Sequence, residues 1–119
     1  MHGCRTLPKT ERLQNGWQFR HAYDTGSRRA GRLLVLYAVP ATQGGRQLGV
    51  VTSRRIGNAV ARNRARRLLR EAYRLNKDKL PPHLQLVMIA RSAIRDQRFH
   101  DVEAEVLNLC RQAGVISKP

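Results

Sequence analysis

The residues of this chain with the clearest chemistry are the arginines between Ser53 and Arg74. Eight of the 23 basic residues fall in this run, and Glu71 is its single acid. Guanidinium groups pair with phosphate oxygens through two hydrogen bonds and stack on bases. A solvated helix face is the simplest interpretation of a charged run. Here, however, like charges repel with almost no internal partner, which costs stability unless an anion lies against them. The run therefore favours a surface that binds a polyanion.

Residues that could carry out hydrolysis are few. The eight carboxylates form no DxD or DxN pattern of the kind that holds two metal ions. Asp101 and Glu105 have the spacing of a solvated i, i+4 pair on one helix. Cys4 and Cys110 lack CxxC or CxxH spacing, so we expect two reduced thiols, with Cys110 packed in the core. The histidines are scattered like surface residues rather than placed like a general base; they are His2, His21, His83 and His100. Catalysis by the protein itself is not indicated.

Composition limits the class of partner. A chain of 119 residues forms one domain, and its net charge of +15 and pI of about 11.6 make nucleic acid the expected partner. A membrane surface is the competing polyanion, but mostly alanine lies opposite the arginines, where a lipid-binding helix carries large apolar residues. The sequence has no apolar run long enough to span a bilayer and no signal-peptide core, which predicts a cytoplasmic protein.

The arginines require a helix to position them. Helical spacing from Asn58 or Ala59 to Leu75 places a basic stripe opposite an apolar face, and Asn58 is expected to cap the first amides. The expected buried residues are Ala61, Ala65, Leu68, Ala72 and Leu75. The expected stripe is Arg62, Asn63, Arg66, Arg67, Arg70 and Arg74.

The remaining elements follow from apolar periodicity. Residues 1–14 are predicted to form a basic arm that is partly ordered and anchored by Leu7 and Leu13. Residues 15–116 are predicted to form a single domain, and residues 117–119 a tail. The expected elements are a helix over 16–24, an edge strand over 27–31, strands over 32–39 and 47–53, a buried strand over 84–90 and a helix over 98–112. The glycines at 44 and 45 favour an antiparallel hairpin between strands 32–39 and 47–53. Strand, helix and strand across 48–90 predict a parallel crossover.

Two features suggest a place for a ligand. Strand 32–39 is apolar on both faces, so it requires cover on both, or cover on one and a ligand on the other. In the first helix Phe19 and Tyr23 share one face, whereas Trp17 and His21 form a second pair on nearly the opposite side. Spacing alone leaves Tyr23 and Tyr37 open to a role as ordinary core aromatics.

The segment SRRIGNAVARNRARRLLREAYR, with Arg62-Asn63-Arg64 at its centre, resembles the protein subunit of bacterial ribonuclease P. The flanking sequences LGVVTS, LLVLYAV and VMIAR fit the same pattern, so the resemblance covers about Leu7 to Val115. It implies an α+β fold: a single mixed four-stranded sheet with helices in the order α-β-β-β-α-β-α. It also implies a left-handed crossover through the arginine-rich helix, although nearly all parallel crossovers are right-handed.

The resemblance also implies a function and two sites. In this family the RNA subunit is catalytic, with Mg²⁺ held mainly by that RNA, and the protein binds the RNA subunit and the 5′ leader of precursor tRNA so that the leader is removed. The implied particle holds one protein and one RNA, with a monomeric protein and neither DNA nor membrane as partner. Residues implied to contact the RNA subunit are Arg54, Arg55, Asn58, Arg62, Asn63, Arg64, Arg66, Arg67 and Arg70. Residues implied to bind the leader are Phe19, Tyr23, Val35, Tyr37 and Ser53, with Tyr23 at a position where Phe is common in the family.

Two alternatives belong to other classes. A ribosomal or general RNA-chaperone protein would share the charge and the basic helix but would need no aromatic surface. A helix-turn-helix DNA reader would not explain the apolar strands that flank the helix.

Overall fold

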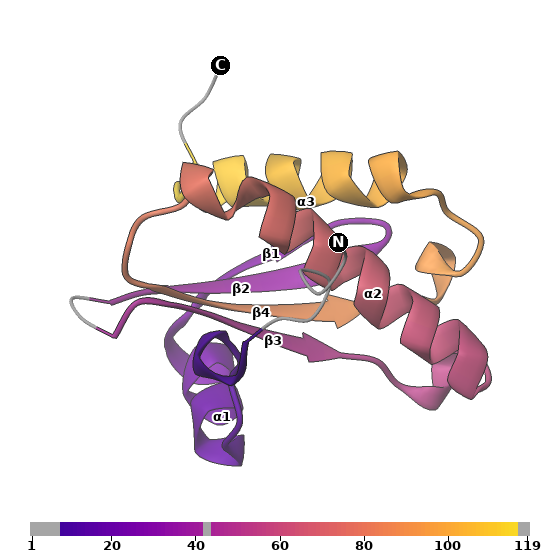
Figure 1. Ribbon diagram of the computed structural model, residues 1–119, viewed down its shortest axis with the longest axis horizontal. Helices are drawn as coiled ribbons and strands as arrows, with labels where there is room; N and C mark the ends of the chain where they lie inside the picture. The colour runs from indigo at the N-terminus through magenta and orange to yellow at the C-terminus, as the bar shows by residue number, and fades with distance from the viewer. Residues whose placement is uncertain (1–7, 42–43, 117–119) are drawn as a thin grey trace.

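The computed structural model describes residues 8–41 and 44–116, which fold into one four-stranded sheet with helices on both faces (Figure 1). The first seven residues of the predicted arm, Leu7 and Cys4 among them, and the tail 117–119 lie outside the described residues. In chain order the main elements are α1 (Gly16–Thr25), β1 (Ser27–Ala30), β2 (Leu34–Pro40), β3 (Arg46–Val51), α2 (Ala59–Asn76), β4 (Leu84–Ala90) and α3 (Phe99–Gln112). Short 3-10 turns are η2 (Lys9–Glu11), η3 (Arg54–Ile56), η4 (Lys77–Lys79) and η5 (Ser92–Ile94). This is the expected α-β-β-β-α-β-α order.

The strands lie in the order β1-β2-β4-β3, so the predicted hairpin between β2 and β3 is wrong. β4 lies between them, antiparallel to β2 and parallel to β3. The chain after β2 passes around the start of β4, where Ala41 N donates to His83 O and Leu84 N donates to Gly45 O. β4 is the most apolar strand, and the central position pairs both of its edges and covers both of its faces.

β3, α2 and β4 form the predicted parallel crossover, and the connection is left-handed (Figure 1). The result agrees with the family resemblance rather than with the general handedness rule. The crossover places α2 on the same face of the sheet as α3, against which it packs.

The two faces of the sheet are covered unequally. α2 and α3 bury one face, which includes Leu36, Leu86 and Met88. Cys110 of α3 is packed there as predicted, and burial raises the pKa of its thiol to about 12. On the other face, α1 contributes Ala22 to a smaller cluster around Val87, with half-buried side chains at its margin.

The buried side of α2 differs from the prediction. Ala65 and Ala72 are buried as expected, but Leu75 is 52% exposed, and Leu69 and Tyr73 are buried in its place. The helix is rotated so that its largest apolar side chains enter the core, which removes more apolar area from water than alanine could. Periodicity identified the helix, but the packing against the sheet and α3 decided its rotation.

The prediction of a solvated pair between Asp101 and Glu105 is also wrong for Glu105. Its carboxylate accepts hydrogen bonds from the amides of Arg32, Leu33 and Leu34, at 2.7 to 3.1 Å. It thus joins α3 to the turn between β1 and β2. These donors lie 71 to 73 residues away in the sequence, beyond the reach of an i, i+4 argument.

From Pro8 onward the predicted arm is docked on the domain. The amide of Leu13 donates to Leu48 O along the outer edge of β3, and the Leu13 side chain is buried, as expected for an anchor. Glu11 pairs with Lys77 Nζ at 3.1 Å and accepts a hydrogen bond from Tyr73 Oη. Burial, and then the charge of Glu11, raise the pKa of Tyr73. The arm therefore contacts both β3 and the end of α2.

Candidate nucleic-acid interface

The start of α2 is fixed by local hydrogen bonds that the sequence encodes. Ser53 Oγ accepts from the amide of Arg55 and begins η3. Gly57 follows with φ of 141°, a conformation that favours glycine. Asn58 Oδ1 then accepts from the amide of Ala61 at 2.9 Å, which is the predicted cap. These contacts fix where α2 begins and the direction in which it leaves the end of β3, and so they position its arginines.

One side of α2 carries a continuous group of polar and basic side chains, which we call the basic face: Asn63, Arg66, Arg67 and Arg70. These residues and Val60 line an open recess of about 500 Å³. Asn63 and Arg67 are exposed, and Arg66 Nη1 donates to Asn63 Oδ1. Among the described residues no carboxylate lines this recess, so the charge of the basic face is available to an external anion.

Arg12 from the docked arm lies near this face, which the sequence did not indicate. Burial, followed by the nearby charges of Arg12 and Arg66, lowers the pKa of Arg70. Three arginines from two distant segments are thus brought close enough for their charges to interact. The sequence gives no pattern from which the neighbours of Arg12 could be predicted, because its position depends on where Leu13 anchors the arm.

Other arginines of α2 point elsewhere, Arg62 and Arg74 of the predicted stripe among them. Arg62 Nη1 donates to Gly57 O at 3.1 Å, and Arg74 forms an ion pair with Glu71 at 2.6 Å. Glu71, the single acid of the arginine-rich run, thus pairs with an arginine one helical turn away. Arg64 lies on the side toward α3, where Nη2 donates to Gln97 O at 2.6 Å. The stripe is therefore narrower than the sequence predicted.

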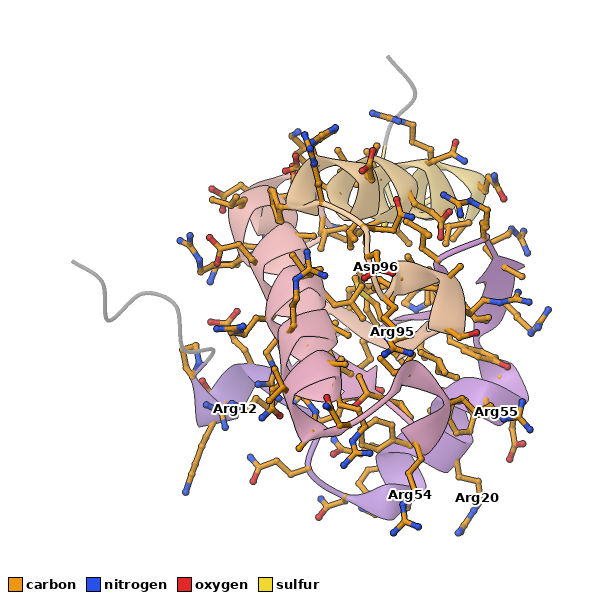
Figure 2. The ribbon with its side chains drawn as sticks, turned by 90° about the vertical axis from the view of Figure 1, so that its right-hand side faces the viewer. Arg12, Arg20, Arg54, Arg55, Arg95 and Asp96 are labelled. Atoms are coloured by element: carbon orange, nitrogen blue, oxygen red, sulfur yellow. The ribbon has the colours of Figure 1, made fainter. Side chains whose placement is uncertain are left out.

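Arg54 and Arg55 are exposed on η3, ahead of α2 (Figure 2). In the same view Arg12 lies to one side of α2, and Arg95 and Asp96 lie to the other. Basic groups therefore lie on several sides of α2, at its start (Arg54, Arg55 and Arg95) and beside Arg70 (Arg12).

The opposite face of the sheet carries a second feature, which we call the aromatic surface: Phe19, Tyr23 and Tyr37. The rings of Tyr23 and Tyr37 meet edge to face, with centroids 5.1 Å apart. Tyr23 is 40% exposed, and burial and then Tyr37 raise the pKa of its hydroxyl. Phe19 packs over Gly49, where a Cβ would lie 2.5 Å from Phe19 Cε1. Of the two aromatic pairs predicted from spacing, Phe19 and Tyr23 therefore face the sheet. Trp17, of the other pair, is 62% exposed on the far side of α1.

The two other residues implied for leader binding lie at different depths. Val35 shares a sheet face with Tyr37, between Ala30 and Ile89, and is buried. Ser53 is exposed beyond the end of β3. Of the five residues, Tyr23 offers the most accessible ring edge or face.

Within residues 8–41 and 44–116, no three histidine, cysteine or acidic side chains gather in a group that could hold a metal ion. None of the helices in this part of the chain is long and apolar enough to cross a membrane.

A mixed sheet with a left-handed crossover, a basic helix on one face and a partly exposed aromatic surface on the other defines an α+β protein with two separate candidate surfaces. Residues 7–114 match the family model for ribonuclease P. The chain belongs to the ribonuclease P protein family.

Relatives in sequence and in structure agree with this assignment. The ribonuclease P protein component of Clostridium botulinum strain Loch Maree is 39% identical over 108 residues, which cover 90% of this chain and 97% of the relative. That of Clostridioides difficile is 35% identical over 108 residues, covering 90% and 95%. A mutant RNase P protein of Staphylococcus aureus, described as defective in mRNA degradation, has a TM-score of 0.82 at 27% identity and covers 91% and 92%. The RNase P protein of Thermotoga maritima has a TM-score of 0.76 at 27% identity and covers 86% and 96%. Membership of this family supports a subunit role in ribonuclease P and in tRNA processing.

Proposed function

We propose that this protein binds the catalytic RNA of ribonuclease P and the 5′ leader of precursor tRNA, and so promotes endonucleolytic removal of the leader in the cytoplasm. The observation that carries the proposal is the presence of two chemically distinct surfaces on one sheet. A basic face, with no carboxylate of the described residues in its recess, lies on one side, and an aromatic pair of exposed Tyr23 and partly buried Tyr37 lies on the other.

The basic face suits a folded RNA. The basic face offers the guanidinium donors of Arg66, Arg67 and Arg70 and the amide donor of Asn63. Among the described residues, no carboxylate in the recess competes for them. Arg12 adds charge beside Arg70. Each phosphate neutralised by these groups releases condensed counterions, which is the main source of RNA affinity for such a surface. Arg54, Arg55 and Asn58 extend the contact at the start of α2.

The aromatic surface suits an unpaired strand. Tyr23 and Tyr37 present ring faces and edges on which bases stack largely without regard to sequence. That tolerance fits a leader whose sequence varies between tRNAs. Phe19, Val35 and Ser53 complete the path along the sheet in this proposal.

Catalysis belongs to the RNA subunit in this proposal, in a particle of one protein and one RNA. Mg²⁺ supplies activation of water and stabilisation of the leaving oxygen. In this proposal the ion is held mainly by the RNA subunit, as the family resemblance implies. The protein contributes substrate binding and charge neutralisation.

Adding the purified chain to ribonuclease P RNA at modest Mg²⁺ tests the proposal directly. We expect faster removal of the 5′ leader from a precursor tRNA than with RNA alone. An absence of stimulation, with RNA binding retained, would instead favour a general RNA-chaperone protein.

A substitution of Tyr23 tests the role of the aromatic surface. Tyr23→Ala should weaken binding of leader-bearing precursor tRNA by about 1–3 kcal/mol, because one stacking surface is removed. Affinity for mature tRNA should stay nearly constant in the same holoenzyme titration. Trp17→Ala is the matched control, because Trp17 is an exposed aromatic on the other side of α1. Equal losses of affinity for both tRNAs would remove Tyr23 from the leader site.

A further inference from the structure

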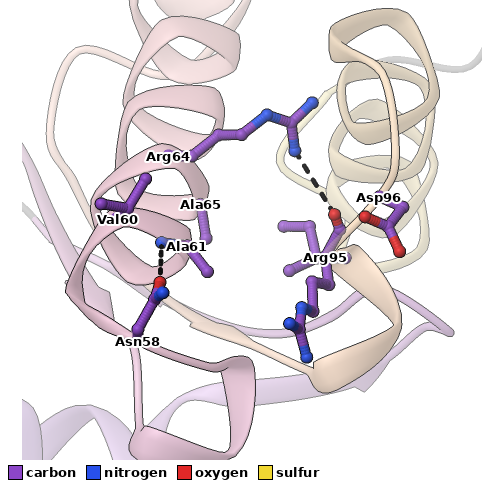
Figure 3. Close-up of a pocket in the computed structure, with 8 residues that line it drawn as sticks. Asn58, Val60, Ala61, Arg64, Ala65, Arg95 and Asp96 are labelled. Carbon is purple, nitrogen blue, oxygen red and sulfur yellow. Dashed lines mark hydrogen bonds between the residues drawn. The ribbon is translucent and has the colours of Figure 1, made fainter.

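A second recess opens on the side of α2 that faces η5 (Figure 3). Its volume is about 390 Å³, and it lies between the first turns of α2 and the segment after β4. Its lining residues are Asn58, Val60, Ala61, Arg64, Ala65, Ile94, Arg95 and Asp96. The parallel pairing of β3 and β4 creates this recess, because it brings the end of β4 to the same edge of the sheet as the start of α2.

The recess has apolar surface beside guanidinium groups. Ile94 is fully buried, and Val60 is 75% exposed, the largest exposed fraction among the large apolar side chains of the described residues. Val60 also lines the recess of the basic face, so the two hollows adjoin at this side chain. An exposed valine between two recesses is a suitable wall for a flat ring.

One of the two arginines of the recess, Arg64, is held by backbone carbonyls, and the other, Arg95, lies against Gly57. Arg64 donates to the carbonyls of Gln97 and Arg95, at 2.6 and 3.5 Å. The guanidinium of Arg95 lies over Gly57, where a Cβ would be 3.5 Å from Arg95 Cζ. A guanidinium plane that is fixed as that of Arg64 is can stack on an unpaired base with little further loss of side-chain entropy.

Asp96 supplies the specific group. Its carboxylate is exposed beside Arg64 and Arg95 (Figure 3), and within the described part of the chain no hydrogen bond or ion pair to it is formed. A carboxylate accepts hydrogen bonds only, through two oxygens. Among the bases, guanine presents two adjacent N–H donors on its pairing edge, so it matches both oxygens at once.

We propose that this recess binds an unpaired guanine base of RNA, with the ring between Val60 and the guanidinium of Arg64 or Arg95 and the pairing edge on Asp96. The inference deepens the proposed function, on which it rests, by adding a base-specific contact next to the basic face. A negative charge at this position discourages nonspecific phosphate binding and favours a base edge instead.

Short RNA provides the test. Oligouridine with one central guanosine should bind the full chain about tenfold more tightly than oligouridine with one central inosine, because inosine lacks one of the two donors. All-uridine RNA should bind no more tightly than the inosine form. The measurement is fluorescence anisotropy at physiological salt, and because it compares RNAs on the unaltered protein it does not depend on any variant folding.

Asp96→Asn localises the preference, because the amide replaces one acceptor by a donor. We expect this variant to bind the guanosine and inosine RNAs equally. Asp78→Asn is the matched control with the same change in charge on the exposed η4 turn, and it should keep the tenfold preference. Equal binding of the guanosine and inosine RNAs by the unaltered chain, or a preference that survives Asp96→Asn, would overturn the inference. Either result is distinct from failure of the proposed function, in which the chain would not stimulate leader removal.

Discussion

At the scale of single residues, two acidic side chains near α3 have opposite relations to the fold. Glu105 uses both oxygens on backbone amides of the β1–β2 turn, whereas Asp96 is left without a partner among the described residues. Gly31 allows the first arrangement, since a Cβ there would lie 2.5 Å from the Glu105 carboxylate. A carboxylate that accepts several amides contributes to stability, and one without partners is available for a ligand.

Glu105→Gln should therefore destabilise the protein by about 2 kcal/mol, because the neutral amide keeps one acceptor and turns a donor toward backbone N–H groups. Urea unfolding followed by circular dichroism measures this change. Asp78→Asn, which removes an exposed charge, should unfold within a few tenths of a kcal/mol of the unaltered chain. Identical midpoints for Glu105→Gln and the unaltered chain would show that the three hydrogen bonds contribute little.

At the scale of elements, α2 connects the core to the candidate interface. Leu69 and Tyr73 enter the core, and this rotation determines which arginines share a face. Arg66 and Arg70 remain together with Asn63, whereas Arg64 turns toward α3 and Arg74 pairs with Glu71. The position of the aromatic surface depends in the same way on α1, which packs against β3 through the contact of Phe19 with Gly49.

Replacing Arg66 and Arg70 by alanine should reduce the slope of log affinity against log salt for the RNA subunit. The expected decrease is about 0.7–0.9 for each phosphate that the variant no longer neutralises. Filter binding over a range of salt concentrations measures the slope. Arg32→Ala, on the exposed turn after β1, should leave it unchanged. If the double variant kept the full slope, those two residues would not bind RNA phosphates.

At the scale of the whole molecule, charge and size act against each other. A net charge of +15 on 119 residues repels itself, and one small core must offset that repulsion. Part of this charge gathers around α2, with Arg54 and Arg55 ahead of its start and Arg12 beside Arg70 (Figure 2). Anions that bind the folded protein should therefore stabilise it in the absence of RNA.

Sulfate should raise the melting temperature of the free protein, because an anion that binds only the folded state stabilises it by mass action. Chloride at the same ionic strength should raise it less, since screening alone lacks the directional hydrogen bonds of a sulfate oxygen with guanidinium groups. Calorimetry in the two salts compares them. Melting temperatures that are equal in both would indicate screening without a site.

The sequence by itself determined the elements and the chemistry of α2. Local periodicity and capping residues predicted the order of helices and strands, the cap at Asn58 and the packing of Cys110, because these depend on neighbours within a few residues. Tertiary structure alone decided that β4 separates β2 from β3, that Leu75 is exposed, and that Glu105 joins the β1–β2 turn. It also brought Arg12 to the basic face and Asp96 to the start of α2. Those outcomes depend on which apolar surfaces compete best for burial across distant segments, and a one-dimensional pattern does not contain that competition.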